Sequence, residues 1–221
     1  MAVSRSHLVL MGPPGAGKGT QADLLAEHLR VPHISTGGML RDEAQRGSEL
    51  GKKAKRLMDR GELVPDEIML GIVRDRIGAP DCARGYILDG FPRSIRQAED
   101  LEKLNGEAGP LLALSLRVPA EVVIKRLSSR RTCRPCGAMY HLVSSPPKKP
   151  DVCDRCGGEL YQRDDDREDV IHARLEVYRR ETEPLLAYYG KRNALVEVDG
   201  TGSRDDVFQR LLEGLAGRGA A

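Results

Sequence analysis

The sequence predicts an α/β protein built on a five-stranded parallel sheet with helices on both faces. Two observations support this fold class. Short apolar runs typical of strands alternate with segments of helical periodicity, which is the pattern of parallel strands joined by crossover helices. The first apolar run also leads directly into a glycine-rich turn and then a helical pattern, which is a common start for such a fold. The five expected strands are 7–11, 31–35, 86–89, 111–118 and 194–198.

The glycine-rich turn is GPPGAGKGT at residues 12–20. Its glycines allow backbone N–H groups to point inward around an anion, and the helix expected over 21–30 adds unpaired donors at its N-terminus. Lys18 can then reach phosphates further along a nucleotide, although Gly19 between Lys18 and Thr20 departs from the general phosphate-loop pattern. The alternative is an ordinary glycine-rich turn. The stretch predicts binding of a nucleoside polyphosphate.

Composition and charge narrow the functional class. The chain has 221 residues, with 35 Lys plus Arg against 33 Asp plus Glu and a net charge of +2, which does not suggest a nucleic-acid-binding surface. No apolar run is long enough to span a bilayer, and residues 1–6 lack the features of a secretory signal. We therefore expect a cytoplasmic protein that binds neither nucleic acid nor membrane.

Two segments interrupt the alternation and are expected to be insertions projecting from the core. Residues 35–64 hold two short helical patterns, the second of which should end at Gly61 as its C-cap. Residues 129–164 are rich in Cys, Pro and Gly and have no helical period. The core is then expected to comprise 1–34, 65–128 and 165–221.

Later helices carry recognisable start signals. A helix over 67–77 is expected to be N-capped by Asp66, and a last helix begins near residue 204. Ser203 and Asp206 have the spacing of a capping pair for that last helix.

Four cysteines form two identically spaced pairs in the second insertion. Each pair is C-x-x-C followed by Gly, so each is expected to form a tight turn with converging thiolates. Two such turns make a four-sulfur site suited to zinc, and four protein ligands leave no position open for catalysis. Two disulfides or a redox pair are the alternatives, and a lone Cys82 is expected to be a buried thiol. The predicted ligands are Cys133, Cys136, Cys153 and Cys156.

Arginines flank the same insertion. Arg126 and Arg130 are four residues apart in a helix expected over 120–131, and Arg163 and Arg174 follow the insertion. These guanidinium groups either form a polyphosphate clamp or pair with neighbouring acids in a solvated salt-bridge network.

Asp89 ends an apolar strand and is expected beside the phosphate loop, where it would hold Mg²⁺ directly or through water. A turn cap is the alternative for this carboxylate. Arg93 and Gln97 are four residues apart, so one helical face could offer a phosphate fork and an amide that reads a base edge.

Taken together, these stretches resemble the adenylate kinases, specifically the long form whose lid carries a zinc knuckle. The resemblance covers nearly the whole chain and includes the Gly19 that is unusual for a general phosphate loop. The similar stretches are GPPGAGKGT at 12–20, STGGMLR at 35–41, LDGFPR at 88–93, RLSSRR at 126–131, the cysteine segment, RDDD at 163–166 and VDGTG at 198–202.

The resemblance implies a P-loop NTPase-like core, with 35–64 as the insertion that binds the nucleoside monophosphate and 129–164 as the zinc-bearing lid. The residues implied to bind ATP are Gly15, Ala16, Gly17, Lys18, Gly19, Thr20, Arg126 and Gly202. Those implied to bind AMP are Thr36, Arg41, Val64, Gly90, Arg93, Gln97, Arg163 and Arg174. Those implied to act on the transferring phosphoryl group or Mg²⁺ are Lys18, Arg93, Arg130, Arg163, Arg174 and Asp89. Gly38 stands where the family usually has an acid, which implies a larger share of Mg²⁺ binding for Asp89.

The expected activity is reversible transfer of a phosphoryl group from MgATP to AMP, giving two ADP, by a monomer whose two insertions close over the nucleotides. The acceptor phosphate is already ionised, so no general base is required. Three alternatives remain open: a kinase for another nucleoside monophosphate, a nucleotide sensor without catalysis, and a zinc-ribbon nucleic-acid binder.

Overall fold

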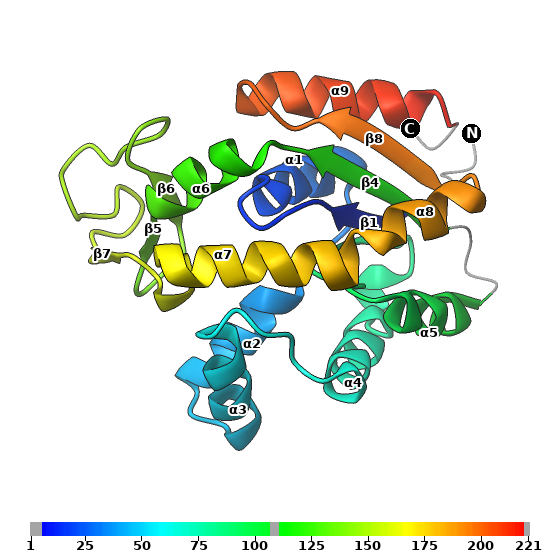
Figure 1. The fold of residues 1–221 in the computed structure, drawn as a ribbon, viewed down its shortest axis with the longest axis horizontal. Coiled ribbons are helices and arrows are strands. Elements are labelled where there is room, and N and C mark those ends of the chain that lie inside the picture. The colour runs from blue at the N-terminus through cyan, green and yellow to red at the C-terminus, as the bar shows by residue number, and fades with distance from the viewer. Residues whose placement is uncertain (1–5, 107–110, 219–221) are drawn as a thin grey trace.

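The computed structural model describes residues 6–106 and 111–218 (Figure 1). The opening residues 1–5, part of the segment in which no secretory signal is expected, lie outside these ranges. The core is a sheet of five parallel strands in the order β2-β3-β1-β4-β8, so the predicted fold class is confirmed. Its strands are β1 (Ser6–Met11), β2 (His33–Ser35), β3 (Gly85–Asp89), β4 (Leu111–Arg117) and β8 (Leu195–Asp199).

Alternating side chains of the sheet divide the core into two layers. Leu8 and Leu10 of β1 face one layer, and Val9 and Met11 face the other, because successive strand residues point to opposite faces. The first layer is covered by α1 (Lys18–Leu29) and α9 (Arg204–Ala216). The second is covered by α4 (Asp66–Ile77), α5 (Ile95–Asn105) and α8 (Pro184–Lys191), and Figure 1 shows α9 above the strands with α4 and α5 below them.

Within the described ranges, no helix combines the length and the apolar character needed to cross a membrane.

A 3₁₀ turn, η1 (Pro80–Cys82), connects α4 to β3 and buries Cys82, as expected for that lone thiol.

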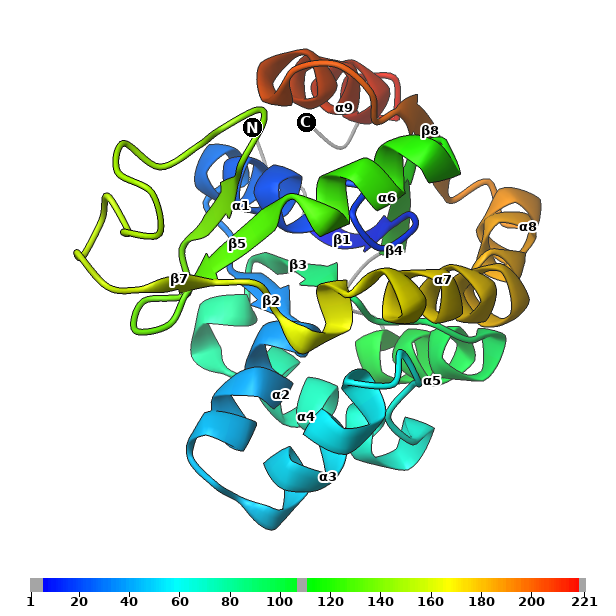
Figure 2. The ribbon, with the colours of Figure 1, turned by 60° about the vertical axis from the view of Figure 1, so that its left-hand side comes forward.

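The first insertion consists of two short helices, α2 (Thr36–Gln45) and α3 (Glu49–Met58), which stand away from the sheet in Figures 1 and 2. Their close crossing requires Gly51, because a Cβ there would lie 2.2 Å from the carbonyl carbon of Glu43. The predicted C-cap at Gly61 is wrong, since α3 ends at Met58 with Asp59 as its cap. Gly61 instead turns the chain two residues later with a φ of 75°, and its N–H group bonds to the carbonyl of Met58.

The second insertion contains a small antiparallel sheet of order β6-β5-β7, visible at the left of Figures 1 and 2. Its strands are β5 (Arg130–Cys133), β6 (Met139–His141) and β7 (Leu160–Tyr161). A 3₁₀ turn, η3 (Asp164–Asp166), leads back to the core, and Lys55 of α3 pairs with Asp164 of this turn at 3.1 Å.

Helix α6 (Ala120–Ser128) packs against α7 (Glu168–Val177), which continues through a π-helical turn, η4 (Tyr178–Thr182). The predicted helix 120–131 is too long, so Arg126 and Arg130 do not share a helix face. The hydroxyls of Ser128 and Ser129 donate to the carbonyl of Lys125 and compete with the helical hydrogen bond. Pairing of β5 with β6 then places Arg130 on a strand.

Of the two predicted N-caps, one is confirmed and the other is wrong. The capping box of Ser203 and Asp206 at α9 is confirmed, with hydrogen bonds in both directions. Asp66 is not the cap of α4, because Pro65 occupies that position and Asp66 is the first helical residue. The carboxylate of Asp66 instead reaches α5, where it accepts hydrogen bonds from Gln97 and Ser94.

Candidate active site

The glycine-rich turn connects β1 to α1 at the carboxyl edge of the sheet, where ligands of open parallel sheets bind. Gly17 caps α1 in the left-handed region with a φ of 94°, which a residue with a side chain rarely adopts. Lys18 lies inside the turn, and its Nζ donates to the carbonyls of Gly12 at 2.8 Å and Pro13 at 2.9 Å. Burial lowers the pKa of Lys18 to about 8, and the nearby Arg93 lowers it too, while Asp89 opposes the shift.

Arg126 of α6 bridges this turn to the chain after β8. It donates to the carbonyl of Ala16 at 3.3 Å and to that of Gly200 at 3.0 Å. Gly202 lies two residues further along, with a φ of 95°. The resemblance implied ATP binding by Arg126 and Gly202, and in the structure Arg126 contacts the turn and the residue two positions before Gly202.

Asp89, the last residue of β3, lies beside the turn. Its Oδ2 is 3.4 Å from where a Cβ of Gly19 would be, so the glycine that departs from the general pattern allows a close approach of this carboxylate. Burial alone would raise the pKa of Asp89, but His33 and Lys18 together lower it, so the carboxylate is ionised at neutral pH.

A cavity opens next to the turn, between the core and α2–α3. Apolar side chains of Leu40, Met58, Val64 and Met69 form part of its wall, and four arginines face it. All eight residues that the sequence predicted for AMP line it, namely Thr36, Arg41, Val64, Gly90, Arg93, Gln97, Arg163 and Arg174.

The four arginines of the cavity wall, and Arg130 behind them, differ in their partners. Arg163 forms a two-pronged ion pair with Asp165, and Arg130, which does not line the cavity, forms another with Asp166. Arg174 contacts both acids, at 3.2 Å each. The two alternatives for these guanidiniums therefore both hold in part: acids pair with all three, and two of them, Arg163 and Arg174, also line a cavity.

Two other arginines have no carboxylate within ion-pair distance among the described residues: Arg41 and Arg93. Arg93 Nε donates to the carbonyl of Gly90 at 2.8 Å, and this residue precedes α5 rather than sharing a helical face with Gln97. Burial, followed by the charge of Arg163, lowers the pKa of Arg41 to about 9. Positive charges thus outnumber negative ones around the cavity, which suits a ligand carrying several anionic groups.

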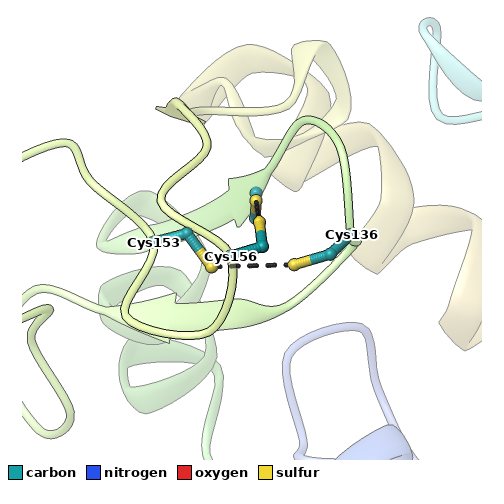
Figure 3. Close-up of side chains that lie close together, drawn as sticks. Cys136, Cys153 and Cys156 are labelled. Atoms are coloured by element: carbon teal, nitrogen blue, oxygen red, sulfur yellow. Dashed lines mark hydrogen bonds between the residues drawn. The ribbon is translucent and has the colours of Figure 1, made fainter.

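The four predicted cysteine ligands form a single cluster. Their Sγ atoms all lie within 4.8 Å of one another, and in Figure 3 the side chains of Cys136 and Cys153 point toward each other with that of Cys156 close beside them. The Sγ distances of 3.4 Å for Cys133–Cys156 and 3.6 Å for Cys136–Cys153 are much longer than a disulfide bond.

The two halves of the cluster have the same local geometry. In each half, the first cysteine carbonyl accepts from a glycine N–H, at 3.0 Å for Gly137 and 2.8 Å for Gly157. Both glycines have positive φ, 70° and 75°. Four converging thiols of this kind fit a tetrahedral metal ion, in which sulfurs 2.3 Å from zinc would be about 3.8 Å apart.

The family model described as adenylate kinase matches residues 10–194. Among curated relatives, an adenylate kinase of Archaeoglobus fulgidus is 52% identical over 207 residues, covering 93% of this chain and 95% of the relative. Those of Methanocella arvoryzae and Thermodesulfovibrio yellowstonii are 54% identical (91% and 94% covered) and 55% identical (93% and 96% covered).

This chain belongs to the adenylate kinase family. The resemblance noted in the sequence is thereby confirmed, and the cysteine cluster fits the zinc-binding lid of the long form.

One residue of this adenylate kinase that sequence reasoning missed is His33. It stands between two carboxylates, with Nδ1 2.8 Å from Asp23 and Nε2 3.6 Å from Asp89. Burial alone would lower the pKa of His33, but the two carboxylates raise it to about 9. A single histidine at a strand start carries no spacing signal, and its acids come from α1 and β3, so only the fold identifies this contact.

Met139 was also missed. Its Cε is 3.7 Å from where a Cβ of Gly19 would be, so β6 of the second insertion reaches over the phosphate loop. Nothing in the local sequence distinguishes Met139 from other partly exposed apolar residues.

The acid–arginine pairs of the adenylate kinase predict a specific pH dependence of stability. Burial alone would raise the pKa of Asp165, but Arg174 and Arg163 hold it well below its usual range. The folded-state pKa is therefore lower than the unfolded value of about 3.9, so the stabilisation is complete above that pH and is lost as the pH falls toward the folded-state pKa. Removing this carboxylate leaves buried arginines poorly paired, at a cost of about 3 kcal/mol.

We expect urea unfolding at pH 7 to show this loss in Asp165→Asn, and the difference from wild type to shrink between pH 4 and pH 2.5. The exposed variant Asp164→Asn is the matched control and should show little change. A difference that stays constant over this pH range would contradict the assigned ionisation.

Proposed function

We propose that this enzyme transfers a phosphoryl group reversibly from MgATP to AMP and produces two ADP. The observation that carries the proposal is the junction of two sites: the phosphate loop with Lys18 adjoins a cavity with an apolar wall and four arginines. Lys18 is close enough to Arg93, Arg130 and Arg174 for their charges to lower its pKa. Two nucleotides bound with their phosphates toward each other would meet at these cations.

On the donor side, the loop residues Gly15, Ala16, Gly17, Lys18, Gly19 and Thr20 would hold the ATP phosphates. Arg126 would lie against the adenine, near Gly202. The hydrogen bonds of Arg126 to Ala16 and Gly200 support this assignment, because they fix the guanidinium between the loop and the chain after β8.

On the acceptor side, the base of AMP would occupy the apolar wall near Val64, and its phosphate would face Arg41 and Arg93. These two guanidiniums are suited to the role because neither is neutralised by a carboxylate in the described structure. Thr36 Oγ1 donates to the carbonyl of Asp89 and lines the same cavity, so it connects the AMP site to the end of β3.

The chemistry needs positioning and charge rather than proton abstraction. The AMP phosphate oxygen is ionised at neutral pH, so catalysis would rest on in-line orientation and on cations that match the charge of the transferring group. That charge would come from Arg130, Arg163 and Arg174. Hydrogen bonds to Asp165 and Asp166 would fix the orientation of these guanidinium groups. The positive charge of the arginines that exceeds that of the neighbouring acids would be neutralised only when the phosphates of the nucleotides bind.

Asp89 fits the role of a Mg²⁺ ligand, because it is an ionised carboxylate beside the phosphate loop and Mg²⁺ is usually held by one or two carboxylates plus substrate phosphates. When bound, Mg²⁺ would neutralise charge on the ATP phosphates. Gly38 offers no second carboxylate, so a larger share of Mg²⁺ binding for Asp89, with a weaker affinity for the metal, stays a prediction.

Incubation with MgATP and each of AMP, GMP, CMP and UMP tests the proposal directly. We expect two ADP to form for each AMP consumed, measured by chromatography, and much slower reaction with the other acceptors. A preference for another monophosphate would favour a different nucleoside monophosphate kinase. Nucleotide binding without turnover would indicate a sensor, and neither binding nor turnover would favour the zinc-ribbon alternative.

The zinc is proposed to be structural, held by Cys133, Cys136, Cys153 and Cys156. Few large apolar groups are buried around the cluster, chiefly Leu160 with Tyr140 and Ala138 against it, so this segment has only a small core of its own. The metal would stabilise the insertion 129–164 as a rigid body that moves over ATP, and 35–64 would close over AMP. The domain limits, the monomeric state and the cytoplasmic location also remain predictions.

Removal of the metal should destabilise the enzyme. We expect one zinc per chain, and loss of zinc in Cys153→Ser together with a fall in melting temperature of about 5 °C or more. Cys82→Ser is the matched control, since Cys82 is buried far from the cluster in the sequence and bonds to Arg76. Zinc retained in Cys153→Ser, or less than one zinc in wild type, would contradict the assignment.

A further inference from the structure

The amide of Gln97 is held by two partners in the wall of the cavity. Gln97 is 2% exposed and lies in the first turn of α5. Its Oε1 accepts from the backbone N–H of Arg93 at 2.7 Å, and its Nε2 donates to Oδ1 of Asp66 at 2.5 Å. Asp66 begins α4, and its other oxygen accepts from Ser94 Oγ at 3.4 Å. Groups from two separate segments, the start of α4 and the chain just before α5, therefore fix one side chain.

The two partners allow only one orientation of the amide. A carboxylate only accepts hydrogen bonds and a backbone N–H only donates, so the oxygen must face Arg93 and the nitrogen must face Asp66. If the amide were rotated by 180°, its NH₂ group would face the N–H of Arg93, and its oxygen would face the carboxylate of Asp66. In a buried position both hydrogen bonds would be lost without replacement by water, which makes the flipped state rare.

The orientation decides what a ligand meets. A primary amide has two N–H donors and two acceptor lone pairs, and the protein uses one of each. One donor and one acceptor remain, in a fixed order, on a residue that lines the cavity. A base edge that pairs with both must carry an acceptor and a donor in the matching order.

Purines with a 6-amino group and purines with a 6-oxo group present opposite orders. Adenine offers a donor at N6 and an acceptor at N1, whereas hypoxanthine and guanine offer an acceptor at O6 and a donor at N1. In the same pose, the two kinds of base need opposite orientations of the amide. A site that fixes its polar groups rejects the wrong partner strongly, because those groups are left unpaired on binding.

We propose that Asp66 is a positioning residue for base specificity: it fixes the Gln97 amide so that the acceptor site takes a 6-aminopurine nucleotide and rejects a 6-oxopurine nucleotide. This inference rests on the proposed function, in which the cavity binds AMP. Asp66 acts through Gln97 and not by contact with the base.

The test compares AMP with IMP, which differs only in the 6-oxo group and the proton at N1, as phosphoryl acceptors with saturating MgATP. The wild-type enzyme should favour AMP in kcat/KM. In Asp66→Asn the new amide can present either its oxygen or its nitrogen to Gln97, so Asp66 no longer selects the orientation and only the backbone N–H of Arg93 still disfavours the flipped state. We expect the AMP-to-IMP ratio of kcat/KM to fall by about tenfold or more, mainly through a gain with IMP. Asp66→Ala, which removes one of the two fixed partners, should lower the ratio as well.

Glu67→Gln is the matched control, because Glu67 is the next acid in the first turn of α4 and is exposed. It should leave the ratio at the wild-type value, and melting curves should show all three variants to be folded. A merely structural role for Asp66 would lower kcat/KM for both acceptors equally. An unchanged ratio in both Asp66 variants, or a wild-type enzyme that uses IMP as well as AMP, would overturn this inference alone. A wild-type enzyme inactive with AMP but active with a pyrimidine nucleotide would overturn the proposed function and this inference with it.

Discussion

Replacing Lys18 by Met is expected to lower kcat/KM for ADP formation by about a thousandfold, the size of effect seen when a fixed cationic or donor group is removed from a transition state. Lys18 is the residue of the phosphate loop whose Nζ can move from the carbonyls of Gly12 and Pro13 to phosphate oxygens. Met has a similar length and no charge, so the loss would report the charge and the hydrogen bonds. Steady-state kinetics with MgATP and AMP give the measurement.

The fold should survive this change. Because burial lowers the pKa of Lys18 to about 8, the charged form, which still predominates at pH 7, is less favourable in the folded state than in the unfolded chain. Lys18→Met should therefore unfold at the same temperature as wild type or at a higher one. Lys53→Met, at an exposed position of α3, is the matched control and should keep full activity. Turnover within tenfold of wild type in Lys18→Met would refute the role given to the loop.

Arg93→Ala should have the second largest effect, a fall in kcat/KM of about a hundredfold or more. Arg93 lines the cavity, is close enough to lower the pKa of Lys18, and has no ion-pair partner in the described ranges. Its charge is therefore available to a phosphate on either side of the transfer. We expect both a higher KM for AMP and a lower kcat, since the same group would bind the substrate and stabilise the transferring phosphoryl group.

Arg96 offers a stringent comparison for this variant, because it lies three residues later and is exposed on α5. Arg96→Ala should retain wild-type kinetics. Equal, small losses in the two variants would mean that general surface charge, and not a specific contact, attracts the nucleotides. If general surface charge attracts the nucleotides, kcat/KM should also fall steeply with added salt.

The sheet could be predicted because its strands carry their own signals. Each is a short apolar run bounded by turn residues, and the alternation with helical patterns leaves few topologies. The phosphate loop and the cysteine cluster could be predicted for the same reason. The residues of the loop are adjacent in the sequence, and the cysteines are paired at a fixed spacing. The errors fell at element ends, where Ser128 and Ser129 ended α6 early and Pro65 replaced Asp66 as a cap.

The arginines show where sequence reasoning stops. The number of arginines and their approximate positions can be read from the sequence. A salt-bridge network and a phosphate clamp, however, are made of the same residue types. The choice depends on which guanidiniums keep a free face, and that is a property of packing: Arg163 pairs with Asp165, whereas Arg41 has no ion pair with any residue that the structure describes. His33 was invisible for the same reason, because its two acids come from other elements.

The sequence by itself determined the fold class, the glycine-rich turn after β1, the four-cysteine cluster and the family, since each is set by residue types at short spacing or by a pattern along the whole chain. Only the tertiary structure decided the orientation of the Gln97 amide, the place of His33 and the pairing of the arginines. Hydrogen bonds and ion pairs have direction and partners, and partners from separate helices and strands meet only when the hydrophobic core has fixed where those elements lie.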